Sequence, residues 1–158
     1  MKADVLVFDA SSILCSETMY DVLRLILECF SMYCRLGVDD IDLYKAYCSP
    51  YGSSDEARPI LRIIYDAIVK RYGLEKLYVP DRRFIDTKSR EITNRTGLHD
   101  CDERYLAVAL AVSTRGLKTI LITQDSDFSN ESVVEYAKNY NIKIIMDRNT
   151  IKSLRINN

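Results

Sequence analysis

Three short apolar runs place the strongest constraint on how this chain folds: VLVF at 5–8, TILIT at 119–123 and IKIIM at 142–146. All three are rich in β-branched residues and alternate little between apolar and polar positions. Such runs are typical of strands that are buried on both faces of a parallel sheet. Weaker strand candidates lie at 41–48 and 76–79.

Longer segments with helical periodicity separate these runs. Apolar residues recur at three- and four-residue spacing over 18–36, 59–72 and 102–115, and a further helix is expected around 130–140. Alternation of strands and helices favours an α/β fold with a parallel sheet and right-handed crossovers. The 158 residues contain no internal repeat and no linker-rich tract, so we expect a single domain over 1–158.

Composition excludes several classes of protein. A hydrophobic content of 47% excludes a disordered chain, and the most apolar segment, 22–34, carries Arg24 and Glu28, which argues against a membrane span. The first apolar run is too short for a signal peptide, and the five cysteines lack CxxC spacing. We therefore expect a cytoplasmic protein with reduced thiols. A net charge of −1 excludes a strongly basic nucleic-acid binder but allows local basic patches.

Two of the apolar runs lead directly into acidic residues. VLVF is followed by Asp9, and TILIT is followed, after Gln124, by Asp125. Functional sites of open α/β sheets form beyond the carboxyl ends of the strands. A single aspartate at such a position more often caps a helix or starts a turn, but two at equivalent strand ends favour a site.

A third acidic signal lies in HDCDERYLAVALA at 99–111. Asp100 and Glu103 have the spacing of a capping box, which predicts a helix start with a structural role for Asp100. Asp102 then falls in the first turn, where the helix dipole is expected to favour its ionised form. Alternate alanines from 107 to 111 would let this helix approach the sheet closely.

Clustered carboxylates without nearby cations repel one another, and one of them is pushed towards protonation. A divalent cation relieves this repulsion. Oxygen ligands without histidine or cysteine suit hard ions, so Asp9, Asp102 and Asp125 predict a site for Mg²⁺ or Mn²⁺. Such an ion can polarise a phosphodiester and orient the attacking water, which indicates metal-dependent phosphoryl or phosphodiester chemistry.

The segments VLVFDASSIL, DERYLAVALA and ILITQDSDF, in this order, resemble those of the PIN-domain nucleases over essentially the whole chain. The resemblance implies a three-layer α/β/α fold with a central parallel sheet of four to five strands, and a homodimer. It also implies a metal-dependent endoribonuclease that cleaves RNA by water attack, leaving 5′-phosphate and 3′-hydroxyl ends. Small single-domain members are frequently toxins of toxin–antitoxin pairs of the VapBC type, inhibited by a small antitoxin protein.

The resemblance assigns roles to individual residues. Asp9 matches the first acidic position of the family, and Ser11 matches the supporting hydroxyl of its D-x-S pattern. Asp102 matches the acid before the L-A-x-A helix, and Asp125 matches the acid after the second apolar run. Asp127, followed by Phe128, matches the D-F pair that often comes next.

The family's remaining acid has no clear match in this chain. We assign Glu56, in SPYGSSDEARP, to this acidic position, and Asp55 is the alternative. Without either of them, the metal site would lack one ligand. Glu103 and Asp127 are candidate alternate or supporting ligands.

Basic residues and the one histidine add weaker signals. The segment 80–97 carries Arg82, Arg83 and Lys88, which could contact RNA phosphates, although its mixed charges equally indicate a solvated helix face. His99 lies beside the acidic motif and is interpreted as a loop residue before the helix.

Other classes of protein fit less well. A dehalogenase-like phosphatase requires DxDxT after the first strand, where this chain has Asp9-Ala10-Ser11, and the acidic pair and lysine of a receiver domain have no convincing match. The alternative that stays open is a non-catalytic PIN-fold module that binds RNA or a protein partner.

Overall fold

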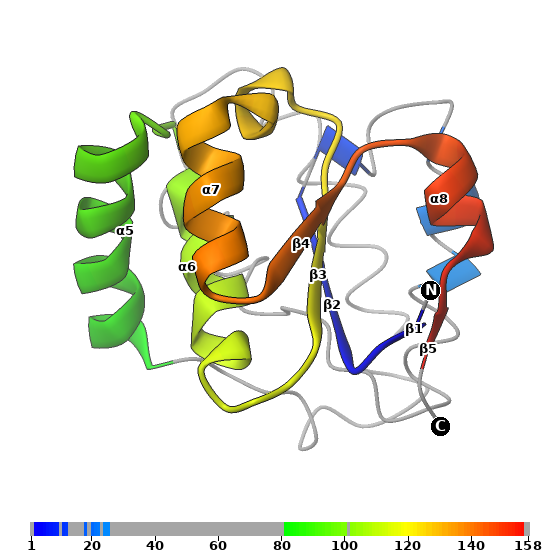
Figure 1. Ribbon diagram of the computed structural model, residues 1–158, viewed down its shortest axis with the longest axis horizontal. Coiled ribbons are helices and arrows are strands. Elements are labelled where there is room, and N and C mark those ends of the chain that lie inside the picture. Colours follow the sequence, from blue (N-terminus) through cyan, green and yellow to red (C-terminus); the bar gives the residue numbers. More distant parts are fainter. Residues whose placement is uncertain are drawn as a thin grey trace.

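The computed structural model describes residues 2–9, 11–12, 18, 20–22, 24–25, 81–100 and 102–156 (Figure 1). Helices and strands are named below by their labels in Figure 1. The strands expected at 41–48 and 76–79, the helix expected at 59–72 and most of the helix expected at 18–36 lie outside the described residues.

Three strands form a parallel sheet in the order β2-β3-β4. They are β2 (Val5–Phe8), β3 (Thr119–Ile122) and β4 (Ile142–Ile145), and they coincide with the three apolar runs, so these predicted strands are confirmed. Phe8 pairs with Ile122, and Ile122 pairs with Ile145. The three strands therefore end at the same edge of the sheet.

Burial differs between the strands. All four residues of β3 are buried, as predicted for a strand covered on both faces. In β4, Lys143 is exposed and Ile144 is half-buried, so the expectation of two covered faces is wrong for this run. The reason is position, because β4 lies at one end of the described strand order.

A second pair of strands joins the two ends of the described chain. β1 (Lys2–Ala3) pairs in parallel with β5 (Arg155–Ile156). The short helix α8 (Arg148–Ser153) precedes β5, and its start is capped by Asp147, which accepts hydrogen bonds from the N–H groups of Asn149 and Thr150.

The helix α6 (Asp102–Ser113) covers the three-stranded sheet. It contacts β2, β3 and β4, and every residue from Tyr105 to Val112 is buried. The fully buried alanines at 107 and 109 allow the close approach to the sheet that the sequence predicts. Because α6 is packed on nearly all sides, its first turn has a fixed position relative to the strand ends.

Two further helices pack around α6 and the sheet. α5 (Arg82–Thr96) lies on the far side of α6 from the strands, as Figure 1 shows. Asp81 caps the start of α5, and Gly97 ends it in a left-handed conformation with φ of 77°, which a residue with a side chain rarely adopts. α7 (Glu131–Asn139) connects β3 to β4 and packs against β4.

The described part of the chain is therefore a mixed α/β structure with a three-stranded parallel sheet, as the strand–helix alternation predicts. Among the described residues, no helix is both long enough and apolar enough to cross a membrane.

Leu110→Ala is expected to lower the free energy of unfolding by about 2–5 kcal/mol, because Leu110 is fully buried in α6 and its truncation leaves a cavity. Val134→Ala in α7 is the control. Val134 is 46% exposed, and its truncation should change this free energy by less than about 0.5 kcal/mol. Urea denaturation followed by circular dichroism measures both, and equal losses would contradict the packing of α6.

Candidate metal centre

The carboxyl ends of β2 and β3 bring Asp9 beside Thr123. The N–H of Asp9, directly after β2, donates to the carbonyl of Ile122 at 2.9 Å, and the N–H of Thr123 donates to the carbonyl of Ile145 at 3.1 Å. These hydrogen bonds extend the pattern of the sheet by one residue. Asp9 and Thr123 thereby become neighbours at the edge where sites of parallel sheets form.

Two hydroxyl groups hold the Asp9 side chain. Its Oδ2 atom accepts hydrogen bonds from Thr123 Oγ1, at 2.7 Å, and from Ser11 Oγ. Thr123 Oγ1 also accepts from the Asp125 N–H at 3.0 Å, and Ser11 Oγ accepts from the Gln124 N–H at 2.9 Å. Both hydroxyls therefore connect Asp9 to the segment that follows β3, and Ser11 lies where the sequence predicts a supporting hydroxyl.

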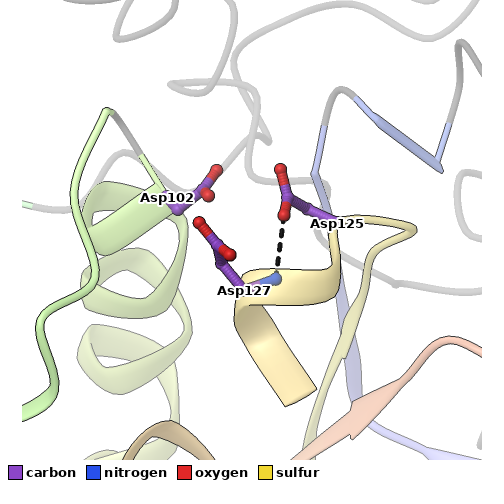
Figure 2. A group of neighbouring side chains, drawn as sticks. All are labelled: Asp102, Asp125 and Asp127. Carbon is purple, nitrogen blue, oxygen red and sulfur yellow. Dashed lines mark hydrogen bonds between the residues drawn. The ribbon is translucent and has the colours of Figure 1, made fainter. Parts of the chain in front are cut away.

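The turn after β3 carries two acidic side chains. Asp125 caps the short 3-10 helix η2 (Ser126–Ser129), and its Oδ1 atom accepts from the Asp127 N–H at 2.9 Å (Figure 2). Phe128 in this turn is fully buried, whereas Asp127 is exposed. Gln124 Nε2 donates to the carbonyl of Met146 at 2.6 Å and so connects the start of the turn to the residue after β4.

Asp102, the first residue of α6, completes a group of three carboxylates. One carboxylate oxygen from each of Asp102, Asp125 and Asp127 lies within 4.8 Å of the other two. Figure 2 shows these side chains pointing toward one another from α6, from the loop before η2 and from η2 itself. We call Asp102, Asp125 and Asp127 the acidic group.

Repulsion within the acidic group is strong. None of its members forms an ion pair with a cation in the described part of the chain. Burial, followed by the charges of Asp9, Asp125, Glu103 and Asp127, raises the pKa of Asp102 from 3.8 to about 9. The helix dipole was expected to favour the ionised form of Asp102, but burial and the repulsion from neighbouring carboxylates act in the opposite direction and raise its pKa. The predicted push towards protonation thus acts on Asp102 and also on Asp9, whose pKa is raised by burial.

Asp9 lies near the acidic group but is not a member of it. Its side chain is buried, and burial raises its pKa above 3.8 against the opposing effect of the hydrogen bonds from Ser11 and Thr123. After burial, the charge of Asp9 is the largest contribution to the raised pKa of Asp102. Of the predicted metal ligands, the structure thus groups Asp102 and Asp125 with Asp127, and holds Asp9 on hydroxyl groups beside them.

The residues around Asp102 have other partners. Glu103 Oε1 lies 3.9 Å from Arg104 Nε. Asp100 Oδ2 lies 2.7 Å from His99 Nδ1, and both side chains are exposed. Asp100 adopts a left-handed φ of 58°, two residues before α6 begins, so it does not occupy the N-cap position that the sequence predicts.

The predicted RNA-contacting residues lie on α5. Arg82 and Arg83 begin this helix, and Arg83 is exposed. Lys88 forms an ion pair with Glu91 at 2.6 Å within the same helix, as expected for a solvated face of mixed charge. Glu56 and Asp55, the candidates for the remaining acid, lie outside the described residues.

Thr123 is the residue of this site that the sequence interpretation missed. It is buried, donates to Asp9 and accepts from the N–H of Asp125, so it links the two strand-end acids. A signal was present, because a hydroxyl at the end of an otherwise apolar strand needs a partner when it is buried. That signal could be read only with the register of β2 against β3.

The donor atoms of the acidic group fit a hard divalent cation. Carboxylate oxygens are the ligands that Mg²⁺ and Mn²⁺ prefer, and three of them converge here from two well-separated segments of the chain. Asp102, Asp125 and Asp127 would hold such an ion, with Asp9 supporting them from its hydrogen-bonded position.

No family model, no curated protein and no solved structure matches this chain. The chemistry of the acidic group is therefore inferred from its own residues.

Without metal, the free energy of unfolding is expected to fall as the pH rises from about 4 to about 9. Asp102 binds its proton with an ordinary pKa of 3.8 when unfolded and with a pKa of about 9 when folded. Its stabilising contribution is therefore complete below pH 4 and is lost as the pH passes through the folded pKa. Asp102→Asn should reduce this slope, leaving the part that the raised pKa of Asp9 contributes, and should stabilise the metal-free protein at pH 8, as measured by urea denaturation in EDTA.

Asp147→Asn is a control for which the change in the free energy of unfolding at pH 8 should have the opposite sign. Hydrogen bonds from Thr150 and Asn149 lower the pKa of Asp147, so its ionised form stabilises the start of α8 above pH 4. This substitution should destabilise the protein at pH 8 and leave the slope due to Asp102 in place. Stabilisation by both substitutions, or a slope unchanged by Asp102→Asn, would contradict the repulsion described for the acidic group.

Mn²⁺ or Mg²⁺ is expected to raise the midpoint temperature of thermal unfolding, because an ion that binds only the folded state stabilises that state. Asp125→Asn should remove most of this rise while retaining an oxygen that accepts from the Asp127 N–H. Asp147→Asn should retain the rise. Differential scanning fluorimetry over a metal titration measures all three proteins, and an equal rise in each would mean that the ion binds elsewhere.

Proposed function

We propose that this protein is an endoribonuclease that hydrolyses RNA phosphodiesters with Mg²⁺ or Mn²⁺ held by the acidic group. The observation that carries the proposal is the convergence of Asp102, Asp125 and Asp127 at the carboxyl edge of a parallel sheet. A protein gains nothing in stability from such crowding, since burial and then the charges of the neighbouring carboxylates raise the pKa of Asp102 to about 9. Perturbed acids of this kind are typical of functional sites.

A phosphodiester is the substrate that this chemistry favours. A hard cation on carboxylates keeps part of its coordination sphere for water and phosphate oxygens, polarises the phosphodiester and lowers the pKa of the attacking water. An aspartate can attack phosphorus, but the DxDxT pattern of the phosphatases that use one is absent after β2, and Ser11 is already engaged with Asp9 and the Gln124 N–H. Hydrolysis by water is therefore the step we assign.

The residues of the chain have distinct parts in this proposal. Asp125 and Asp127 hold the cation from a turn that the buried Phe128 keeps in place. Asp102 gives up its proton when the cation binds, which makes binding tighter as the pH rises. Thr123 and Ser11 position Asp9, and Thr123 also fixes the backbone of Asp125.

The finer assignments follow from the sequence resemblance to the PIN-domain nucleases. The order of Asp9, Asp102 and Asp125 along the chain supports them, together with their places after β2, at the start of α6 and after β3. On this basis we propose a single three-layer PIN-like domain with a sheet of four to five strands, a homodimer, a cytoplasmic location and a toxin's role beside a small antitoxin. Glu56 is the proposed fourth acid.

Asp125→Asn is expected to lower Mn²⁺-dependent cleavage of RNA at least about 100-fold, because even the outer partners of a metal site are worth about 10–100-fold. Thr123→Val removes one such partner and should lower cleavage by about 10–100-fold. Cleavage of a fluorophore-labelled RNA measures both, with circular dichroism to verify the fold.

Asp147→Asn is the matched control for loss of an aspartate and should cleave like the wild type. Cleavage that survives Asp125→Asn would overturn the proposal. A wild-type chain that binds RNA but cleaves none with either metal would instead favour the alternative of a non-catalytic RNA-binding module.

A further inference from the structure

A pocket of about 320 Å³ opens between α5 and α6. Its lining includes Asp86, Ser89, Arg90 and Asn94 from α5, and Glu103 and Arg104 from α6. Apart from Glu103, which adds its charge to the repulsion on Asp102, these residues have no part in the acidic group. A pocket of this volume is large enough for a purine base, which is a small ring system.

The charges of the pocket are balanced. Two carboxylates, Asp86 and Glu103, face two guanidinium groups, Arg90 and Arg104, and Asp86 accepts from Arg104 at 2.8 Å. A balanced lining does not favour an isolated phosphate or a metal ion, because each would meet one repelling pair. It favours an uncharged ligand whose edge carries both donors and acceptors, since carboxylates only accept and guanidinium groups only donate.

Ser89 gives independent evidence that the pocket is built for a hydrogen-bonding ligand. It is only 3% exposed, and its Oγ atom has no hydrogen-bond partner in the part of the chain that the structure describes. A buried hydroxyl without a partner costs free energy, and such groups in a folded protein call for an explanation. A ligand that enters the pocket would supply the missing partner.

The pocket adjoins the acidic group through α6. Glu103 and Arg104 directly follow Asp102, and Glu103 is close enough to Asp102 for its charge to raise the pKa of that residue. A nucleic-acid strand with a phosphodiester at the acidic group would therefore bring a nearby base within reach of the pocket.

We propose that this pocket binds the guanine base of an RNA strand and so selects where the strand is cut, an inference that rests on the proposed function. Guanine presents two donors, N1–H and the N2 amino group, which suit a carboxylate, and two acceptors, O6 and N7, which suit a guanidinium group. Single-stranded bases are read by such edge contacts. Adenine lacks the paired donors, and the pyrimidines lack the N7 acceptor.

Binding of free nucleotides to the intact, metal-free protein tests the pocket without any cleavage. Guanosine 5′-monophosphate should bind at least about tenfold more tightly than the adenosine, cytidine and uridine monophosphates, because a good bidentate pair contributes about 1–3 kcal/mol. Inosine monophosphate, which lacks the N2 amino group, should bind with intermediate affinity. Isothermal titration calorimetry in EDTA measures each affinity, and equal or undetectable binding of all five would overturn the proposal.

Two substitutions locate the binding. Ser89→Ala should weaken guanosine monophosphate binding about two- to tenfold, as loss of one hydrogen bond predicts, while leaving the stability of the free protein unchanged or raised. A merely structural serine would give the opposite pattern. Arg90→Ala changes an exposed side chain that the fold tolerates, and should weaken binding about tenfold.

The matched controls are Thr87→Ala and Arg95→Ala, on exposed positions of α5 that do not line the pocket. Both should bind guanosine monophosphate like the wild type. If Arg95→Ala weakens binding as much as Arg90→Ala does, the nucleotide is attracted only by the general charge of the helix, and the pocket assignment is wrong.

Cleavage mapping distinguishes this inference from the proposed function. Cuts at a fixed distance from guanosine, weakened when inosine replaces it or when Arg90 is changed to alanine, support both. Cuts without base preference overturn the pocket's role in selecting the strand, whether or not the free nucleotide binds. If the protein binds guanosine monophosphate but cleaves no RNA, the pocket is a nucleotide-binding site. The proposed nuclease activity is then wrong, and so is the proposed selection of the cleavage position.

Discussion

The candidate site depends on a backbone that keeps like charges together. Coulomb repulsion pushes Asp102, Asp125 and Asp127 apart, and no cation among the described residues offsets it. Three features of the fold oppose the repulsion. They are the pairing of β2 and β3, which end at the same edge of the sheet, the burial of α6 and the buried ring of Phe128. Because these elements cannot move without losing packing, the carboxylates stay together, and burial and repulsion raise the pKa of Asp102.

Much of the architecture could be predicted because it follows from the local hydrophobic pattern of the sequence. Runs rich in β-branched residues predicted β2, β3 and β4, and the small residues of α6 predicted its close packing on the sheet. Asp9 and Asp125 could be placed at one edge because parallel strands share their carboxyl end. Lys143 was misjudged because the number of covered faces depends on strand order, which the run IKIIM does not reveal.

The details of the site depend on three-dimensional distances and could not be predicted in the same way. Asp127, rather than Asp9, joins Asp102 and Asp125 because the 3-10 turn directs it toward α6, whereas Asp9 is held by Ser11 and Thr123. The raised pKa of Asp102 comes from burial and from charges on other segments, which outweigh the local helix dipole. Glu56 stays a prediction, since it lies outside the described residues.

The short turn after β3 also determines which kinds of sequence change the site can tolerate. Asp125 and Asp127 belong to one compact turn. The Asp125 N–H donates to Thr123 Oγ1 at its start, and the buried Phe128 holds it against the core. The side chain of Ser126 in this turn is exposed, so we expect its replacement to leave the turn intact. Insertion or deletion of a single residue would displace both acids at once, which makes the length of this loop, more than its composition, the trait that selection must preserve.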